Sequence, residues 1–372
     1  MSQEHLEGPP DVPGYPVRVS ICVANYNYCD YVGLAVDSAL GQTYPNVEVV
    51  VVDDGSTDSS LEVLRAYGDR ICLIGQTNAG HIAALNRAFA TSTGDVVLFL
   101  DADDLLEPQA VERVVGALAA GTAKVQFRLQ VIDGQGAPKG VFPHRLLPLD
   151  AGDLRPLLCR EGEYVGPVTS GNAYVREALA QVLPLEGGSF ANLHDGSGPD
   201  GYLNSMVPFF GKVVSIDEVL GSYRAHGANH SAASGTLPLR FVQWRVDHEL
   251  RREAEIRRLA ASQGLTVRSH LMCSNPEHVL VRLLSLRLAP EQHPVPGDRR
   301  ARLIRLVLTR GLRSQSSPTA RRLLVVAVCV LCAVLPVRWV PDAASWTLAS
   351  RPRPRVLRAL ASLLSRRPRG VS

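Results

Sequence analysis

Three aspartates lie close together in the stretch LFLDADDLLEP, where Asp101, Asp103 and Asp104 follow an apolar run. Carboxylates at such short spacing resist ionisation unless a cation compensates their charge. Proteins commonly hold Mg²⁺ or Mn²⁺ with one or two carboxylates, and substrate phosphates complete the coordination shell. The Gly and Glu offsets of an EF-hand calcium loop are missing here. We therefore expect this cluster to bind a divalent metal that arrives with a nucleotide diphosphate.

A second acidic pair, Asp53 and Asp54, ends the apolar stretch VEVVVVDD. An aspartate at a strand end can accept hydrogen bonds from a base N–H or from ribose hydroxyls. Capping of the next helix is the alternative role, but Ser56, Thr57 or Asp58 can fill it. The pair precedes that turn, so we expect at least one of the two aspartates to contact a nucleoside.

The elements that must position these aspartates alternate between strands and helices. Strands are expected over 17–27, at the start of 47–60, and over 70–78, 95–104, 124–133 and 212–227. Helical spacing covers 29–44, 81–94 and 109–121, whereas 134–200 is richer in Gly and Pro. Nearly continuous apolar strands alternating with helices predict a mainly parallel sheet that is covered on both faces.

The polar clusters Ala24–Tyr28, Asp53–Asp58 and Asp101–Asp104 each follow a predicted strand. Ligands of such sheets bind beyond the carboxyl ends of the strands, so the topology should bring the clusters to one edge. No GxGxxG follows the first strand and no GxxxxGK[ST] is present, which argues against a dinucleotide site and a P-loop. Carboxylates and polar loops would have to hold a nucleotide here.

Residues 19–60 and 78–108 together resemble the family 2 glycosyltransferases with the GT-A fold, a Rossmann-like α/β fold with a mixed, mainly parallel sheet. The resemblance is dense over 17–120 and thinner at 169–179, 199–203 and 215–231. It implies an inverting glycosyltransferase of the hexosyltransferase type, with a nucleotide-diphosphate sugar as donor. A UDP-sugar is the default, because it is the commonest donor of the family.

The resemblance also assigns roles to residues on the donor side. It places the nucleoside on the Ala24–Asn27 loop and on Asp54, with Asp53 beside it. It places the metal on Asp103, with Asp101 and Asp104 near. Ala24 departs from the Pro or Thr that is usual there. The expected nucleotide-sugar residues are Ala24, Asn25, Tyr26, Asn27, Asp53, Asp54, Asn78, Asp101, Ala102 and Asp103.

Inversion requires a base on the side opposite the leaving diphosphate, and the family places an acidic residue at a helix start. Asp200 in GSGPDGYLNSM is the best match, although Pro199 stands where Glu is frequent. Such a base takes the proton of the acceptor hydroxyl. Asp195 is the rival, and capping of the helix that begins at Gly201 is the structural alternative.

Two further segments match the family more thinly. In TSGNAYVR, the residues Ser170, Gly171 and Asn172 are candidate acceptor contacts, with a tight turn as the alternative. In SYRAHGANHS, the side chains of Arg224 and His226, together with Asn229, belong to a loop expected to close near the diphosphate. A cation there would neutralise phosphate charge, whereas a lone His is often structural.

Charge divides the chain in two. Residues 1–239 carry 14 Lys and Arg against 28 Asp and Glu, whereas residues 240–372 carry 25 against 8. We divide the chain into a loose N-terminus (1–16), a GT-A domain (17–235) and a helical, Arg-rich extension (236–372). The GT-A domain comprises a nucleotide-sugar half, 17–120, and an acceptor half, 121–235.

The extension contains two segments with the character of membrane contacts. The apolar run 323–337 is shorter than the roughly 20 residues of a spanning helix, so it is expected to be a buried, re-entrant or interfacial helix. Residues 351–370 read as a basic amphipathic helix, the type that lies on anionic lipid. No aromatic residues alternate with its arginines, so nucleic acid is not the expected partner.

The expected setting is the cytoplasmic face of a membrane. Residues 1–14 lack the basic and apolar regions of a secretory signal, and an odd number of cysteines does not suggest a disulfide framework. The leading hypothesis is thus a transferase that builds cell-surface polysaccharide or glycolipid on a glycan or lipid-linked acceptor. A nucleotidyltransferase would need a Gly-rich, cationic loop after the first strand, which VANYNYCD lacks. A non-catalytic scaffold with the same fold is the remaining alternative.

Overall fold

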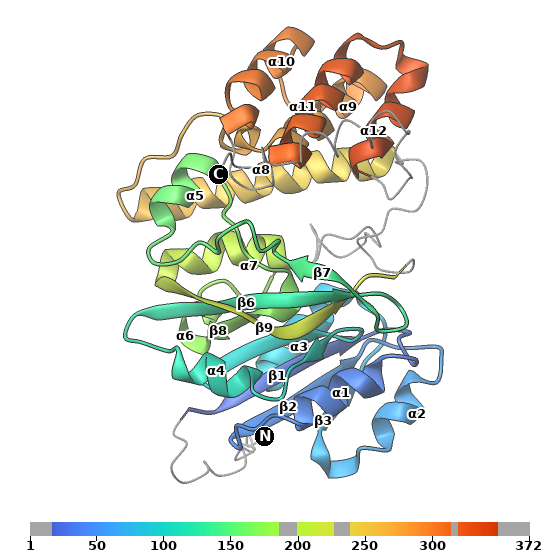
Figure 1. Ribbon diagram of the computed structural model, residues 1–372, viewed down its shortest axis with the longest axis vertical. Helices are drawn as coiled ribbons and strands as arrows, with labels where there is room; N and C mark the ends of the chain where they lie inside the picture. Colours follow the sequence, from blue (N-terminus) through green and yellow to red (C-terminus); the bar gives the residue numbers. More distant parts are fainter. Residues whose placement is uncertain (1–16, 186–198, 227–238, 314–318, 349–372) are drawn as a thin grey trace, which may run out of the picture.

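The alternation of strands and helices continues through the first half of the chain, as expected, in the computed structural model (Figure 1). The structure describes residues 17–185, 199–226, 239–313 and 319–348. The predicted loose N-terminus, the rival base Asp195, Asn229 and the predicted tail helix within 351–370 lie outside these residues.

One mixed sheet organises the catalytic part, with the order β3-β2-β1-β4-β8-β6-β9-β5, and β7 pairs with β6. The pairs β1–β2, β1–β4, β2–β3 and β6–β9 are parallel, and the others are antiparallel. The described strands are β1 Val19–Asn25, β2 Val47–Asp53, β3 Cys72–Gly75, β4 Val96–Asp101, β5 Leu105–Leu106, β6 Thr122–Ile132, β7 Pro138–Phe142, β8 Asn172–Val175 and β9 Lys212–Arg224. The sheet class that the sequence predicted is confirmed, and β8 inserts an antiparallel strand between its parallel parts.

Helices cover both faces of this sheet because its strands are apolar on both sides. Successive residues of a strand point to opposite faces of the sheet. Val19, Ile21 and Val23 therefore pack with α1, α2 and α4 on one face, whereas Cys22 packs with α3 on the other. Each fully buried Val, Leu or Phe contributes roughly 1.5–3 kcal/mol. The helices here are α1 Val32–Leu40, α2 Ser60–Arg65, α3 His81–Thr91, α4 Ala110–Gly116, α5 Arg155–Glu161, α6 Arg176–Ala180 and α7 Asp200–Met206.

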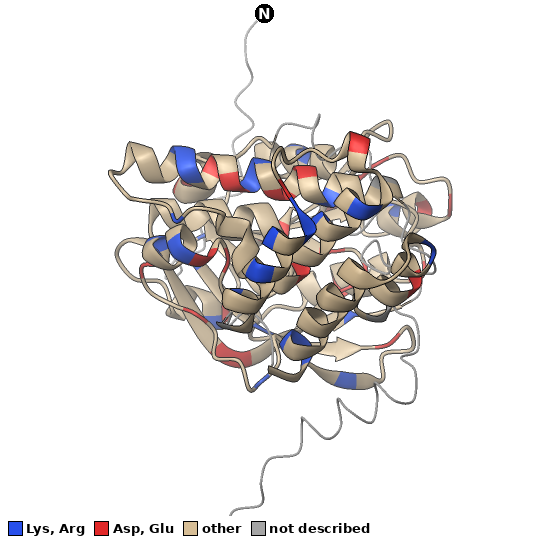
Figure 2. Cartoon of the chain, turned by 90° about the horizontal axis from the view of Figure 1, so that it is seen from above, with Lys and Arg blue, Asp and Glu red and all other residues tan. Residues whose placement is uncertain are grey.

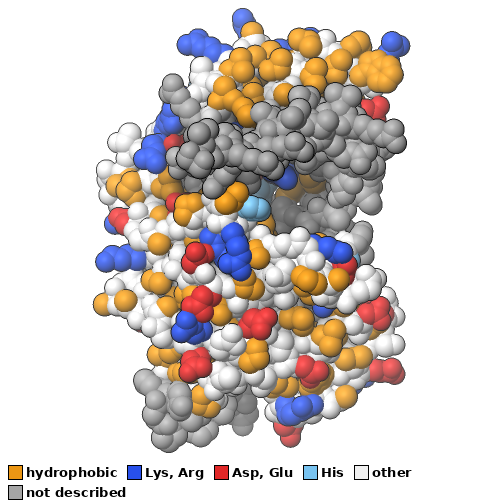
Figure 3. Space-filling view, viewed as in Figure 1, with side chains coloured by type: hydrophobic (Ala, Val, Ile, Leu, Met, Phe, Trp, Pro, Cys, Tyr) orange, Lys and Arg blue, Asp and Glu red, His pale blue; other side chains and the backbone are white. Residues whose placement is uncertain are grey.

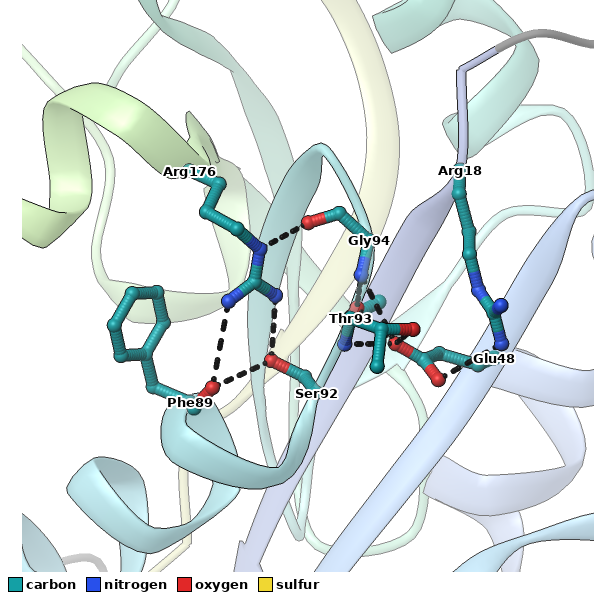
Figure 4. Close-up of polar contacts among 8 residues, drawn as sticks. Arg18, Glu48, Phe89, Ser92, Thr93, Gly94 and Arg176 are labelled. Atoms are coloured by element: carbon teal, nitrogen blue, oxygen red, sulfur yellow. Dashed lines mark hydrogen bonds and ion pairs between the residues drawn. The ribbon is translucent and has the colours of Figure 1, made fainter. Parts of the chain in front are cut away.

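The amino ends of the strands are tied together by one carboxylate, Glu48 (Figure 4). Its oxygens accept hydrogen bonds from Arg18 Nη2 at 3.0 Å, Ser20 Oγ at 2.5 Å, and the backbone N–H groups of Thr93 and Gly94 at 2.5 and 3.1 Å. The chain passes so close to β1 at Gly94 that an added Cβ would lie 2.6 Å from the backbone nitrogen of Ser20. This network fixes the edge opposite the acidic loops.

The extension is helical from Leu239 onward, as expected, and has its own apolar core. Its helices are α8 Leu239–Ser262, α9 Pro276–Leu288, α10 Arg300–Thr309, α11 Thr319–Val334 and α12 Val340–Leu348. Figure 1 shows α8 lying between the sheet and the other four helices. A second cluster, which includes Phe209 and Ile256, joins α8 to the sheet domain.

The structure buries one face of the apolar run 323–337 in the core of the extension, which fits the first of the three roles considered for it. Helix α11 contributes Val325, Val328, Cys329 and Cys332 to the core of the extension. None of the described helices combines the length and the apolar character needed to cross a bilayer. The apolarity of 323–337 thus arises mainly from packing against α9 and α12.

Candidate active site

Strand register brings the acidic loops to one edge of the sheet. Asn25 of β1 pairs with Asp53 of β2, and Ala24 pairs with Asp101 of β4. Asp53 in turn pairs with Gly75 of β3, so the loop that contains Asn78 begins at the same edge. Clusters that are separated by tens of residues in sequence therefore lie side by side beyond the carboxyl ends of the parallel strands.

Asp53 and Asp54 are both buried, and each is occupied by protein donors. Asp53 accepts hydrogen bonds from Asn25 Nδ2 at 2.8 Å and from the backbone N–H and hydroxyl of Ser56. Asp54 accepts from Gln76 Nε2 at 2.7 Å and from the backbone N–H groups of the loop before α3. Both carboxylates thus shape the loops around them, and their direct contact with a nucleoside stays a prediction.

The remaining donor-side residues differ in accessibility. Asn27 is exposed, has a φ of 60°, and accepts a hydrogen bond from the Thr57 N–H at 2.7 Å. Tyr26 and Ala24 are partly exposed and Asn78 is exposed, whereas Asn25 and Ala102 are buried. The outer residues of these loops are therefore the accessible ones among those predicted to contact the nucleotide-sugar.

The three aspartates after β4 separate into different environments. Asp104 is fully buried and accepts hydrogen bonds from Ser170 Oγ at 2.6 Å and from the Arg224 N–H at 2.8 Å. Both of its oxygens thus accept hydrogen bonds from the protein, and its role as a metal ligand stays a prediction. Asp101 keeps 28% of its side chain exposed, and Asp103 lies at the same edge.

The charges of these buried carboxylates favour the binding of a cation. Burial raises the pKa of Asp101 well above its usual value, and the charges of Asp103 and Asp200 raise it further. Burial also raises the pKa of Asp103, against the opposing effect of His226. Asp104 has a pKa raised by burial and by its two neighbours. A divalent cation would relieve this repulsion, so Asp101 and Asp103 fit a metal.

No ready-made cage of three or more His, Cys, Asp or Glu side chains exists among the described residues. A metal that arrives with substrate takes part of its coordination shell from the substrate phosphates. His226 stands beside the cluster, with Nε2 3.0 Å from Asp103 Oδ2. Its ring stacks on Tyr31 at 5.2 Å between centroids and meets the edge of Tyr28 at 6.0 Å. The sequence analysis did not identify these tyrosines as a platform for His226.

Arg224 lies in the predicted loop region but has a structural position. It is buried, and its Nε donates to the backbone oxygen of Asp103 at 2.8 Å. Its guanidinium also lies 4.8 Å from the ring centroid of Tyr31. Arg224 therefore holds the acidic loop in place, and His226 is the member of the pair next to a carboxylate of the cluster.

The TSGN segment is a tight turn, the alternative considered for it. Residues Thr169–Gly171 form a 3-10 helix, and Asn172 begins β8. Ser170, Gly171 and Asn172 are buried, and Asn172 Nδ2 donates to the backbone oxygen of Val168 at 2.6 Å. The contact of these three residues with the acceptor sugar stays a prediction.

Asp200 begins α7 and is partly buried. Burial raises its pKa, while the Gly201 N–H and the charges of Lys124 and Arg252 act in the opposite direction. Asp101 is influenced in turn by the charge of Asp200, so the candidate base lies near the acidic edge. Arg252 comes from α8 of the extension, and its Nη1 lies 3.9 Å from where a Cβ of Gly201 would be.

Lys124 is the residue near Asp200 that the sequence analysis missed. It is fully buried on β6, and its Nζ donates to Gln126 Oε1 at 3.0 Å, Tyr164 Oη at 2.7 Å and Asn204 Oδ1 at 2.5 Å. Burial lowers its pKa well below the usual value. Asn204 lies one helical turn after Asp200 on α7. The hydrogen bond from Lys124 to Asn204 therefore fixes the helix that carries the candidate base.

Comparisons with known proteins agree with this architecture. The family model described as Glycosyl transferase family 2 matches residues 20–166. An uncharacterized glycosyltransferase of Nostoc sp. is 36% identical over 234 residues, which are 59% of this chain and 69% of the relative. A chondroitin synthase of Pasteurella multocida is 43% identical over 97 residues, which are 25% of this chain but 10% of that protein.

Among solved structures, residues 1–349 of S. aureus TarS, in complex with UDP-GlcNAc, share the fold with a TM-score of 0.51 and 17% identity. The match covers 88% of this chain and 91% of that one. Fold and relatives define the class as a glycosyltransferase with a GT-A-like fold. The chain belongs to glycosyltransferase family 2.

Proposed function

We propose that this enzyme transfers a sugar, with inversion, from a nucleotide-diphosphate sugar to a hydroxyl group of a cell-surface glycan or glycolipid acceptor. The observation that carries the proposal is the meeting of Asp101 and Asp103, at the carboxyl edge of the parallel strands, with Asp200 on α7. The acidic pair supplies a place for the diphosphate and its metal. Asp200 supplies a base near that place but on a separate element.

Each residue has a defined task in this proposal. Asp200 accepts the proton of the acceptor hydroxyl while that oxygen forms a bond to the anomeric carbon and the nucleotide diphosphate departs. Asp103 and Asp101 would hold a Mg²⁺ or Mn²⁺ ion, which would supply positive charge against the departing diphosphate. His226, whose Nε2 lies 3.0 Å from Asp103 Oδ2, would donate to an oxygen of the diphosphate.

The solved relative supports a UDP-sugar as the first donor to try, since TarS was solved with UDP-GlcNAc. Release of nucleoside diphosphate would be measured with Mn²⁺ or Mg²⁺ and a panel of UDP-, GDP- and dTDP-sugars. We expect slow metal-dependent release from one donor, lost in Asp103→Ala. Asp200→Asn should keep donor binding but lose turnover. If none of the donors in the panel binds in a metal-dependent way, the proposal is wrong and the non-catalytic scaffold is favoured.

A further inference from the structure

The end of the chain concentrates positive charge. Residues 299–372 contain 16 Arg, no Lys and a single acidic residue, Asp342. Figure 2 looks onto the helical end of the molecule and shows basic residues spread over it. The described arginines at the start of α10, Arg299 and Arg300, are exposed. A surface of one sign is suited to an anionic partner.

Exposed apolar side chains gather in the same part of the chain. Of nine large apolar residues that are exposed in the described part, six fall between positions 308 and 339. They are Leu308, Leu312, Leu331, Val334, Val337 and Trp339. Figure 3 shows apolar side chains gathered over this upper end. An apolar patch with basic residues at its border marks an interaction surface.

The most exposed of these side chains form what we call the 331–339 corner, where α11 ends and η8 (Val337–Trp339) leads into α12. Val334 is 71% exposed, Trp339 52%, Val337 48% and Leu331 37%. At the end of α11, Cys332 and Ala333 are buried, so the core face of the helix reaches this corner. The apolar run recognised in the sequence is therefore a core helix with an exposed apolar tip.

This corner is held in place by a buried arginine. Arg287 of α9 donates from Nη1 to the backbone oxygens of Cys332 and Ala333 at 2.7 and 2.8 Å, and from Nη2 to that of Leu335 at 2.7 Å. Carbonyls at a helix end need such partners, and a cation suits the negative end of the helix dipole. The tip is thus a formed surface that the protein presents to its surroundings.

Basic side chains lie next to the tip. Arg338 belongs to it, with its guanidinium 5.8 Å from the ring centroid of Trp339. Helix α10, which Arg300 begins and Arg299 precedes, packs against α11. Tryptophan with neighbouring arginines is the combination found where a protein meets the boundary between headgroups and acyl chains.

We infer that the 331–339 corner, with Arg299, Arg300 and Arg338, docks the enzyme on an anionic lipid bilayer. Trp339 and the valines enter the acyl boundary, and the arginines meet lipid phosphates. The cytoplasmic leaflet offers this chemistry, because it carries anionic lipid. A second copy of this chain is disfavoured, since its own arginines would oppose those of the first. The inference does not depend on the sugar-transfer proposal.

The test uses the full chain and vesicles of phosphatidylcholine with or without phosphatidylglycerol, measured by co-sedimentation. The triple variant Val334→Ser, Val337→Ser, Trp339→Ser should lower partition onto the anionic vesicles by about tenfold. Leu34→Ser is the matched control, because Leu34 on α1 is 51% exposed and lies outside the surface. Thermal melting and donor binding verify that both variants are folded.

A second arm tests the charges. Arg299→Gln, Arg300→Gln, Arg338→Gln should weaken binding to anionic vesicles and make the remaining binding less sensitive to salt. Wild-type binding by the triple serine variant would overturn the inference and assign lipid binding to another part of the chain. Sedimentation velocity tests the alternative of a subunit contact. If the wild type is a dimer and the triple serine variant is a monomer that still binds vesicles, the inference is overturned.

Discussion

The two edges of the sheet handle buried carboxylates in opposite ways. At the amino edge, burial opposes ionisation of Glu48, but hydrogen bonds from Ser20 and Thr93 and the charge of Arg18 outweigh it, so its pKa is lowered. At the carboxyl edge, burial raises the pKa values of Asp101 and Asp103, and the charge of Asp103 adds to the rise at Asp101. A carboxylate that serves the fold brings its donors with it, whereas a repelling cluster prepares the place for a cation.

The largest effect should follow from Asp103→Asn. Loss of this carboxylate should lower metal-dependent turnover by about 10²–10⁴-fold, because the charge of the departing diphosphate would lose its metal. Steady-state release of nucleoside diphosphate against metal concentration measures it. Asp104→Asn is the matched control, and its folded fraction should retain metal-dependent donor binding. Near-normal turnover in Asp103→Asn would contradict the assignment of a metal to the carboxyl edge.

At the amino edge, Glu48→Ala should destabilise the fold without damaging catalysis. Loss of its bonds to Arg18, Ser20 and the 93–94 backbone should cost about 2–4 kcal/mol in free energy of unfolding, measured with urea. Glu62→Ala, an exposed change on α2, serves as the control. Because the folded-state pKa of Glu48 is lowered, its contribution is present near neutral pH. It fades as pH falls through that folded-state pKa, and the alanine variant should lack this acid-side loss.

An intermediate effect is expected for Lys124→Met. Lys124 lowers the pKa of Asp200, so its removal should raise that pKa and move the acid limb of the rate profile to higher pH. Turnover near neutrality should fall by about tenfold. Arg128→Met controls for burial, since Arg128 lies on the same face of β6 but anchors the backbone of Pro143 and Leu147. If the acid limb moves equally in both variants, Lys124 has no specific effect on the pKa of Asp200.

The smallest effect should come from Ser170→Ala. Its hydroxyl donates to Asp104 and accepts from the Asp101 N–H at 3.1 Å, so its loss should cost about 1 kcal/mol in stability. The KM for the acceptor should stay unchanged, because Ser170 is buried beneath the site. A raised acceptor KM at unchanged stability would support the sugar-contact role that the sequence predicts.

The sequence predicted well where the signal is local and repeated. Apolar strands followed by Asp53 and Asp101, with helices between them, were enough to place these residues at one edge. It predicted poorly along β6, where Lys124, Gln126 and Arg128 alternate with apolar residues yet are all buried. Their partners come from distant segments, such as the Asp150 backbone oxygen, which accepts from Gln126 Nε2 at 2.9 Å.

The sequence by itself determined the class of the sheet, the helical extension and the family, because hydrophobic periodicity and short motifs are properties of neighbouring residues. Only the tertiary structure decided which carboxylates remain available. Asp104 is claimed by Ser170, 66 positions away, and by Arg224, 120 positions away, while Asp101 stays partly exposed. It also decided that one face of the apolar run of α11 lies in the core. Burial and hydrogen-bond satisfaction depend on residues that only the folded chain brings together.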